Sequence, residues 1–232
     1  MRIIVLRTAH IPLSGESAAT RTVSIMDPEA SSKIAAAIAA IAGETGQHRP
    51  LTVVCVGTDR STGDSLGPLV GTLLLWNAFE GEVMGDLDNP VHAENLESAT
   101  SRLHSPRGLV IGVDACLGTR QEVGTVMVRP GPLRPGLGVK KKLAPVGDLY
   151  VAGVVNVGGF MEYMVLQNTR LSLVLKMAQI IAAGIIEADR LLRVGHPAAS
   201  AQGYTGSKPF TLAVPENAAL PLPLARESVR SR

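Results

Sequence analysis

The stretch LTVVCVGTDRSTGDSLGPLVGTLLLW, residues 51–76, contains a strand, a polar loop and a helix in direct succession. Residues 51–56 form a short β-branched run typical of a buried strand, and residues 69–76 are apolar enough for a packed helix. Between them, residues 57–68 include glycines, a proline, two aspartates and four hydroxyl side chains. In open α/β sheets, ligands and catalytic groups gather at the carboxyl ends of strands, so we expect this loop to lie at a functional edge.

The rest of the chain continues the alternation of strands and helices. Helices are expected at residues 27–44, 66–79, 91–103, 160–167 and 171–192, and strands at 51–56, 81–90, 107–118, 122–136 and 147–159. This order predicts an α/β domain with a mainly parallel sheet covered on both faces. Residues 1–26 are expected to be an N-terminal extension, residues 27–193 the α/β domain and residues 194–232 a flexible C-terminal tail.

Composition excludes several classes of function. Aromatic residues make up 3% of the 232 residues, and 22 Lys and Arg nearly balance 20 Asp and Glu, so we expect no nucleic-acid partner. Two cysteines indicate neither a zinc site nor a disulfide framework and favour a reduced, cytoplasmic setting. Lys176 and Gln179 interrupt the most apolar segment, which favours a buried helix over a membrane span. The helix-rich exterior is compatible with a homo-oligomer.

Asp64 and Asp114 are the main candidates for chemistry. Asp64 lies near the start of the helix that follows the loop, where an aspartate either caps the helix or serves a site. Asp114 follows four residues suited to a buried strand, where an unpaired carboxylate costs several kcal/mol. Both residues are expected at the carboxyl ends of parallel strands. Two carboxylates in one cleft have their pKa values driven apart, so either they form an acid and base pair that activates water, or they are unrelated structural residues.

Three other polar residues are candidates for substrate binding. Asp59 and Arg60 begin the polar loop, where they either form a local turn or ion pair or position a substrate. Asn156 ends the fourth long strand, where it either lines the cleft or caps the next helix.

His92 raises the alternative of a divalent metal. Together with Asp64 and Asp114 it would supply imidazole and carboxylate ligands of the kind that zinc or nickel takes. The other interpretation of a lone histidine is a polar residue with ordinary hydrogen bonds.

Four strings of sequence resemble a known family. They are CVGTDRSTGDSLGPLVG, DNPVHAENL, VIGVDACLG and GFMEYMVLQNTRLSLVLKMA. Together they are similar to the YyaC sporulation proteins, a group related to the germination protease GPR and more remotely to the hydrogenase maturation proteases. The resemblance extends over residues 27–188.

The resemblance implies a three-layer αβα fold of the phosphorylase/hydrolase type (HybD-like) in a spore-forming bacterium. In germination proteases two aspartates are essential, in motifs similar to GDSLGP and GVDACLG, which correspond to Asp64 and Asp114 here. In hydrogenase maturation proteases acidic residues at these places, with a histidine, contact the nickel of the substrate. The residues around His92 do not follow that family's pattern. This chain is also much shorter than a germination protease, so cleavage of small acid-soluble spore proteins does not carry over.

These observations lead to one expected function and two alternatives. We expect a sporulation-associated peptidase, in the cytoplasm of the forespore or mother cell, in which Asp64 and Asp114 activate water against a peptide bond of a protein or peptide substrate. The first alternative is a protein that binds a peptide or partner without cutting it. The second is a metal-binding sensor that uses Asp64, Asp114 and His92.

Overall fold

The computed structural model describes residues 6–7, 21–46, 50–101, 103, 108–135 and 144–194. The predicted tail beyond residue 194 and most of the predicted extension before residue 21 lie outside the described residues. The α/β class is confirmed, because strands and helices alternate through most of the described chain.

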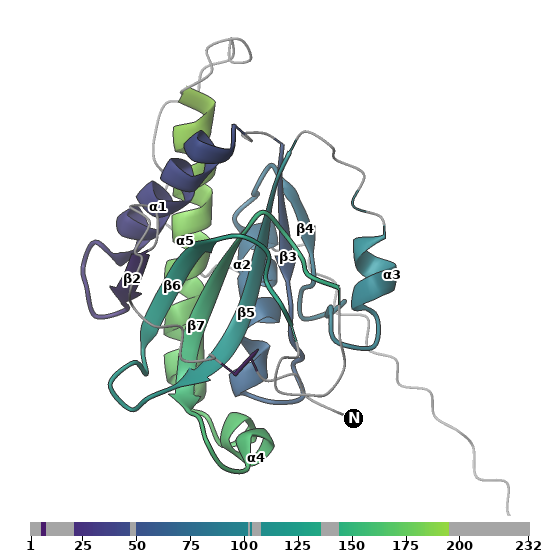
Figure 1. Ribbon diagram of the computed structural model, residues 1–232, viewed down its shortest axis with the longest axis vertical. Helices are drawn as coiled ribbons and strands as arrows, with labels where there is room; N and C mark the ends of the chain where they lie inside the picture. The colour runs from purple at the N-terminus through teal and green to yellow at the C-terminus, as the bar shows by residue number, and fades with distance from the viewer. Residues whose placement is uncertain are drawn as a thin grey trace, which may run out of the picture.

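One sheet forms the centre of the molecule (Figure 1). Its strands are β1 (Leu6–Arg7), β2 (Arg21–Ser24), β3 (Leu51–Cys55), β4 (Glu82–Met84), β5 (Leu109–Gly118), β6 (Thr125–Pro130) and β7 (Leu149–Val157). The strand order is β2-β6-β7-β5-β3-β4, and β1 pairs in parallel with the end of β5. The strands β7, β5, β3 and β4 are mutually parallel, whereas β6 is antiparallel to β7 and β2 is antiparallel to β6. The sheet is therefore mixed, and the prediction of a mainly parallel sheet is wrong.

The length of one connection explains this difference. A parallel return needs a crossover of about a dozen residues or more, because the chain must travel back along the whole strand. Only residues 119–124 separate β5 from β6. The chain therefore turns at Gly124, which has a φ of 88°, and β6 runs back against the direction of β5.

The helices are divided unequally between the two faces of the sheet. Side chains along β3 and the residue after it alternate between the two faces of the sheet. Val53 and Cys55 belong to one hydrophobic cluster, and Val54 and Val56 belong to another on the opposite face. Helices α1 (Ala30–Thr45), α2 (Leu66–Trp76) and α5 (Leu171–Val194) pack on the first face, and the short α3 (Leu96–Thr100) packs on the second. Helix α4 (Glu162–Gln167) projects at one end of the molecule (Figure 1).

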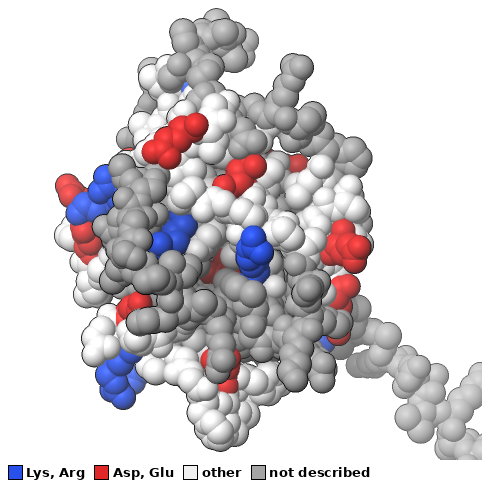
Figure 2. All heavy atoms as spheres, viewed as in Figure 1, with Lys and Arg blue, Asp and Glu red and all other residues white. Residues whose placement is uncertain are grey.

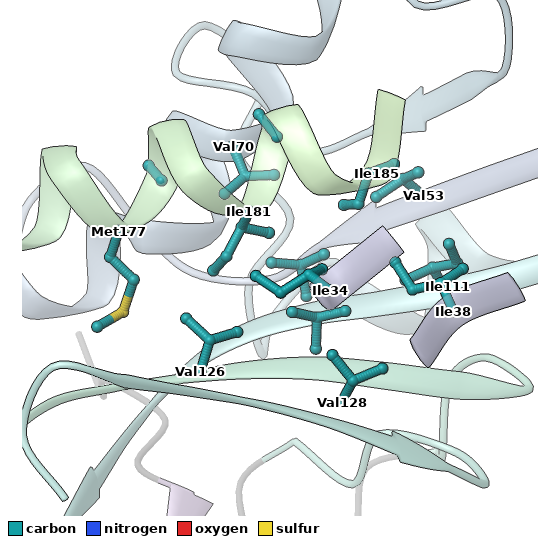
Figure 3. Packing of buried hydrophobic residues seen from close by; sticks show 14 of the residues in the cluster. Ile34, Ile38, Val53, Val70, Ile111, Val126, Val128, Met177, Ile181 and Ile185 are labelled. Atoms are coloured by element: carbon teal, nitrogen blue, oxygen red, sulfur yellow. The ribbon is translucent and has the colours of Figure 1, made fainter. Parts of the chain in front are cut away.

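The larger cluster is aliphatic and joins α1 and α5 to the sheet (Figure 3). Helix α1 buries Ile34, Ile38 and Ile41, the spacing that marked it as amphipathic in the sequence. A Cβ at Gly184 of α5 would lie 2.7 Å from Ile34 Cγ2, so this glycine allows the two helices to approach closely. The helix begins at Ala30 rather than Asp27, whose carboxylate instead accepts a hydrogen bond from the Glu29 amide at 2.9 Å.

Among the described residues, α5 is the one helix long and apolar enough to cross a membrane. Its apolar face, which includes Val174, Met177, Ile181 and Ile185, is buried in the main cluster. This packing is that of a core helix, as the interruptions at Lys176 and Gln179 led us to expect.

Candidate active site

The loop after β3 folds back onto the end of its own strand. The Gly57 amide donates to the Val91 carbonyl at 2.8 Å, and the Thr58 amide donates to the Asp64 carbonyl at 3.1 Å. Gly57 has a φ of 144°, and a Cβ there would overlap the Asp64 carbonyl oxygen. A side chain at Gly57 would therefore disrupt the turn that carries Asp64.

A second glycine sets the start of the following helix. A Cβ at Gly67 would overlap the Val56 carbonyl oxygen, so the first turn of α2 packs directly against the end of the β3 run. Gly63–Ser65, directly before α2, form a short 3-10 turn. No side-chain hydrogen bond caps the N-terminus of this turn or of α2. Asp64 therefore does not cap the helix that follows it.

Asp64 is buried in this turn, with 3% of its surface exposed. Burial raises the pKa of its carboxyl group from 3.8 to about 7, against the opposing effect of a backbone hydrogen bond from Thr58. Such a group exchanges its proton near neutral pH, as a general base must.

Asp114 lies within β5 and is 1% exposed. Asp114 is an even number of residues from Val110 and Cys116 along the strand, so all three side chains lie on the same face. That face is the one covered by α3. One carboxyl oxygen, Oδ1, accepts the Ala115 amide at 2.7 Å, and Oδ2 has no hydrogen-bond partner among the described residues. A buried oxygen without a partner costs about 1–3 kcal/mol, so Asp114 destabilises the fold unless another group or a proton satisfies Oδ2.

The two carboxyl groups act on each other electrostatically. The pKa of Asp114 is raised well above its usual value, first by burial and then by the negative charge of Asp64, while the Ala115 amide opposes the rise. The two aspartates therefore interact electrostatically, but the expectation that both lie at strand ends is wrong for Asp114, which lies inside β5, whereas Asp64 lies in the turn after β3. Their environments differ, because the pKa of Asp64 is raised to about 7 by burial, while that of Asp114 is raised by burial and also by the charge of Asp64.

Asp59 and Arg60 lie at the exposed beginning of the same loop. The Thr58 hydroxyl donates to Asp59 Oδ1 at 3.4 Å and accepts the Arg60 amide at 3.3 Å. These contacts are those of a local turn, on the solvent side of the loop that buries Asp64.

Asn156 links the end of β7 to the corner between α4 and α5. Its Nδ2 donates to the Thr169 hydroxyl at 3.1 Å and to the Val165 carbonyl at 3.3 Å, and its Oδ1 accepts the Val157 amide at 2.8 Å. It also borders a hollow of about 480 Å³ beside α4. Asn156 therefore holds the corner in place and contacts an open surface.

His92 belongs to a turn before α3. Its amide donates to Asn95 Oδ1 at 2.7 Å, and its ring Nδ1 accepts the Glu94 amide at 3.3 Å. It borders a separate hollow of about 580 Å³ between β4 and α3, in which neither Asp64 nor Asp114 takes part.

The three residues suggested as metal ligands do not lie together. Across the described ranges, no three His, Cys, Asp or Glu side chains are arranged to hold a metal ion, so Asp64, Asp114 and His92 do not form the three-ligand group that the sequence suggested.

Sequence reasoning did not single out Ser61 and Gly63. The Ser61 hydroxyl is buried in the same loop and has no hydrogen-bond partner among the described residues. A Cβ at Gly63 would lie 2.7 Å from Leu166 Cδ2 and 2.9 Å from Thr169 Oγ1, so the turn that carries Asp64 packs against the α4–α5 corner. The density of hydroxyl and glycine residues in STGDS was the available signal, but contact with a corner about a hundred residues later is not visible in a sequence.

Comparison with known proteins gives two matches. The family model described as "Protein of unknown function (DUF1256)" matches residues 22–184. The chain is also 52% identical over 145 residues to the "Uncharacterized protein YyaC" of Bacillus subtilis (strain 168), an alignment that covers 61% of this chain and 71% of that relative.

Proposed function

The chain belongs to the DUF1256 family, and we propose that it is a peptidase in which Asp64 and Asp114 activate water against a peptide bond. The observation that carries the proposal is the pair of buried carboxyl groups, one with a pKa raised to about 7 and one with a pKa raised well above its usual value by burial and by the charge of the first. Pairs whose environments push their pKa values apart supply a base and an acid in the same site.

Each carboxyl group has a distinct part in the proposed hydrolysis. Asp64, as carboxylate, accepts a proton from water while the water oxygen attacks the carbonyl carbon of the peptide bond. Asp114, as carboxylic acid, donates its proton to the leaving nitrogen as the carbon–nitrogen bond breaks. The hydroxyl of the water ends on the new carboxyl group and a proton on the new amine. The proton on Asp64 then passes back to Asp114 and restores the starting pair.

The unpaired Oδ2 of Asp114 supports the role of Asp114 as the acid and of Asp64 as the base. Its Oδ1 is occupied by the Ala115 amide, so Oδ2 is the oxygen available to carry and donate the proton. A structural aspartate in a strand would be expected to have both oxygens satisfied.

Burial of the pair favours one competing function. Asp64 and Asp114 are 3% and 1% exposed, so a substrate must displace neighbouring groups before it reaches either carboxyl. A protein that binds a peptide or partner on this fold without cutting it needs no such access. The sensor hypothesis lacks comparable support, because its three ligands do not assemble.

The wider setting of the proposal rests on the resemblance to the YyaC sporulation proteins. We place the activity in sporulation, in the cytoplasm of the forespore or mother cell. We also propose a relationship to the three-layer phosphorylase/hydrolase-like (HybD-like) fold, which is supported by α1, α2 and α5 on one face of the sheet and α3 on the other.

The test is hydrolysis of a peptide pool in water enriched in oxygen-18. The pool is made by digesting the proteome of a spore-forming bacterium, and new termini are identified by mass spectrometry. We expect wild-type protein to create new carboxyl termini that carry the heavy oxygen, and Asp64→Asn and Asp114→Asn to create none. Asp88→Asn is the control, because Asp88 is an exposed aspartate outside the loop of Asp64. The proposal would be contradicted if both variants cleaved as well as wild type. It would also be contradicted if wild type cleaved neither the peptide pool nor intact proteins from the same cells.

A further inference from the structure

Large apolar side chains are exposed together around α4. They are Val157, Phe160, Met161, Tyr163, Met164 and Leu171, which we call the α4 surface. Phe160 is 84% exposed and Met161 is 57% exposed. Single exposed apolar residues are ordinary on proteins, but several in one short segment are typical of a binding surface, and Val157, Phe160 and Met164 line one hollow. Figure 2 shows that the projecting end of the molecule over α4 is mostly free of charged side chains.

The α4 surface contains a hollow of about 480 Å³. Val157, Phe160, Met164 and Val165 contribute apolar groups to its lining, and Asn156 and Asn168 contribute polar ones. The hollow is shallow and widely open to solvent, and apolar surface with a few polar groups at its border suits a side chain laid on it from another molecule. Methionine suits such a site, because its flexible thioether adapts to differently shaped partners.

The backbone holds these residues outward. Met161 has a φ of 51°, in the left-handed region that residues with a side chain seldom adopt. Within the six residues of α4, Leu166 is the buried one, so the helix is anchored on one side chain and presents its other apolar residues to the outside. A strained residue beside an outward apolar helix is typical of a functional surface.

The α4 surface is continuous with the turn that carries Asp64. Asn156, at the edge of the hollow, donates to the Thr169 hydroxyl. The same hydroxyl and Leu166 pack against Gly63, the residue before Asp64. A chain seated in the hollow therefore lies next to the candidate catalytic turn.

We propose that the α4 surface binds an apolar side chain of a polypeptide substrate and thereby sets which peptide bond is presented to Asp64 and Asp114. This inference rests on the proposed function. A polypeptide segment is the favoured occupant because the hollow accepts individual side chains and borders the turn that would carry out the reaction. A second copy of the chain, which would cover the whole surface, is an outcome of the test.

The first experiment measures binding without cleavage. A synthetic library of short randomised peptides is selected on protein with the substitution Asp64→Asn, so that no peptide is consumed. We expect the selected peptides to carry Phe, Leu or Met at one constant position. Adding Phe160→Asp or Met164→Asp should weaken their binding by about tenfold or more, as expected for loss of a buried apolar anchor. Selected peptides without an apolar residue in common would overturn the inference.

Leu75→Asp is the matched control. Leu75 is an apolar residue that is 50% exposed near the far end of α2, and we expect its substitution to leave peptide binding unchanged. Circular dichroism and thermal unfolding establish that each variant is folded. Phe160→Ser replaces Phe160→Asp if the charged variant unfolds. If the Leu75 and Phe160 variants lost peptide binding to the same extent, the inference would be overturned.

A second set of measurements separates this inference from the proposed function. If wild type cuts the selected peptides, Phe160→Ser should raise KM more than it lowers kcat, and unchanged kinetics would overturn the inference while the peptidase proposal stands. If the peptides bind the α4 surface but wild type never cuts them, the surface stands and the peptidase proposal fails. Sedimentation velocity tests for a second copy, and a dimer that Phe160→Asp converts to monomer would overturn the choice of a polypeptide occupant.

Discussion

Replacing Asp64 by asparagine should change how the stability of the protein depends on pH. In the folded protein the pKa of Asp64 is about 7, against 3.8 for an ordinary aspartate. Between these two pH values the folded state holds a proton that the unfolded state has released. Because the folded state binds more protons in this window, the free energy of unfolding falls as the pH rises through it. The asparagine side chain of the variant has no proton to release, so this fall is absent from the variant.

The size of the effect follows from the pKa difference. Each pKa unit corresponds to about 1.36 kcal/mol, so a rise from 3.8 to about 7 corresponds to at most about 4 kcal/mol. Asparagine introduces an amide that needs its own hydrogen bonds, at a cost of about 1–3 kcal/mol that does not depend on pH. The informative quantity is therefore the stability of Asp64→Asn minus that of wild type, which should grow by up to about 4 kcal/mol between about pH 4 and pH 8.

The assay is urea unfolding at closely spaced pH values, followed by circular dichroism at constant ionic strength. Asp59→Asn is the control, since it removes an aspartate from the exposed part of the same loop. We expect the curve of this control to follow that of wild type. If the difference between Asp64→Asn and wild type stays constant across the pH range, Asp64 is not a buried carboxyl with a raised pKa. The acid and base assignment would then be wrong.

Three further predictions concern the glycine at the start of α2, the core and the pH dependence of activity. Gly67→Ala should lower the free energy of unfolding in urea by more than about 2 kcal/mol, because the added Cβ would overlap the Val56 carbonyl oxygen. Gly43→Ala is the control, since nothing lies within 4 Å of its added Cβ, and it should stabilise α1 by up to about 1 kcal/mol. Ile38→Ala should cost about 2–5 kcal/mol in the same assay, because Ile38 is fully buried in the main cluster, and a cost below about 1 kcal/mol would contradict that packing. The rate of peptide hydrolysis should rise with pH through about 7 as Asp64 ionises, and should fall at a higher pH where Asp114 loses its proton; a rate that falls between pH 5 and pH 7 would reverse the two roles.

Much of the site could be predicted from local patterns. Asp64 lies in the loop after the buried run of β3, as expected, and Asp114 follows the buried start of β5, although that strand continues to Gly118 and does not end there. The structure also explains the glycines on either side of Asp64, because a Cβ at Gly57 or Gly67 would overlap a backbone carbonyl oxygen. Their roles in a reaction stay a proposal.

Other features depended on distances that a sequence does not contain. His92 has residue chemistry suited to a metal, yet it forms a local turn before α3 and does not assemble a three-ligand group with the two aspartates. Asn156 has its amide engaged by Thr169 and Val165, residues of a corner that forms only when α4 and α5 pack beside β7. Strand β6 runs antiparallel because the connection before it is too short to cross the sheet.

The sequence by itself therefore determined the long helices and the strands β3, β5 and β7 with their buried faces, because hydrophobic spacing acts over a few residues. It missed β2 (Arg21–Ser24), which lies in the stretch expected to be an extension, because that strand depends on its pairing with the distant β6. The tertiary structure alone decided the direction of β6, the electrostatic coupling of Asp64 with Asp114, and the exposure of the α4 surface. Each of these depends on which distant segments come into contact. A carboxyl group changes its pKa, and an apolar side chain is left uncovered, only according to what the rest of the fold places around it.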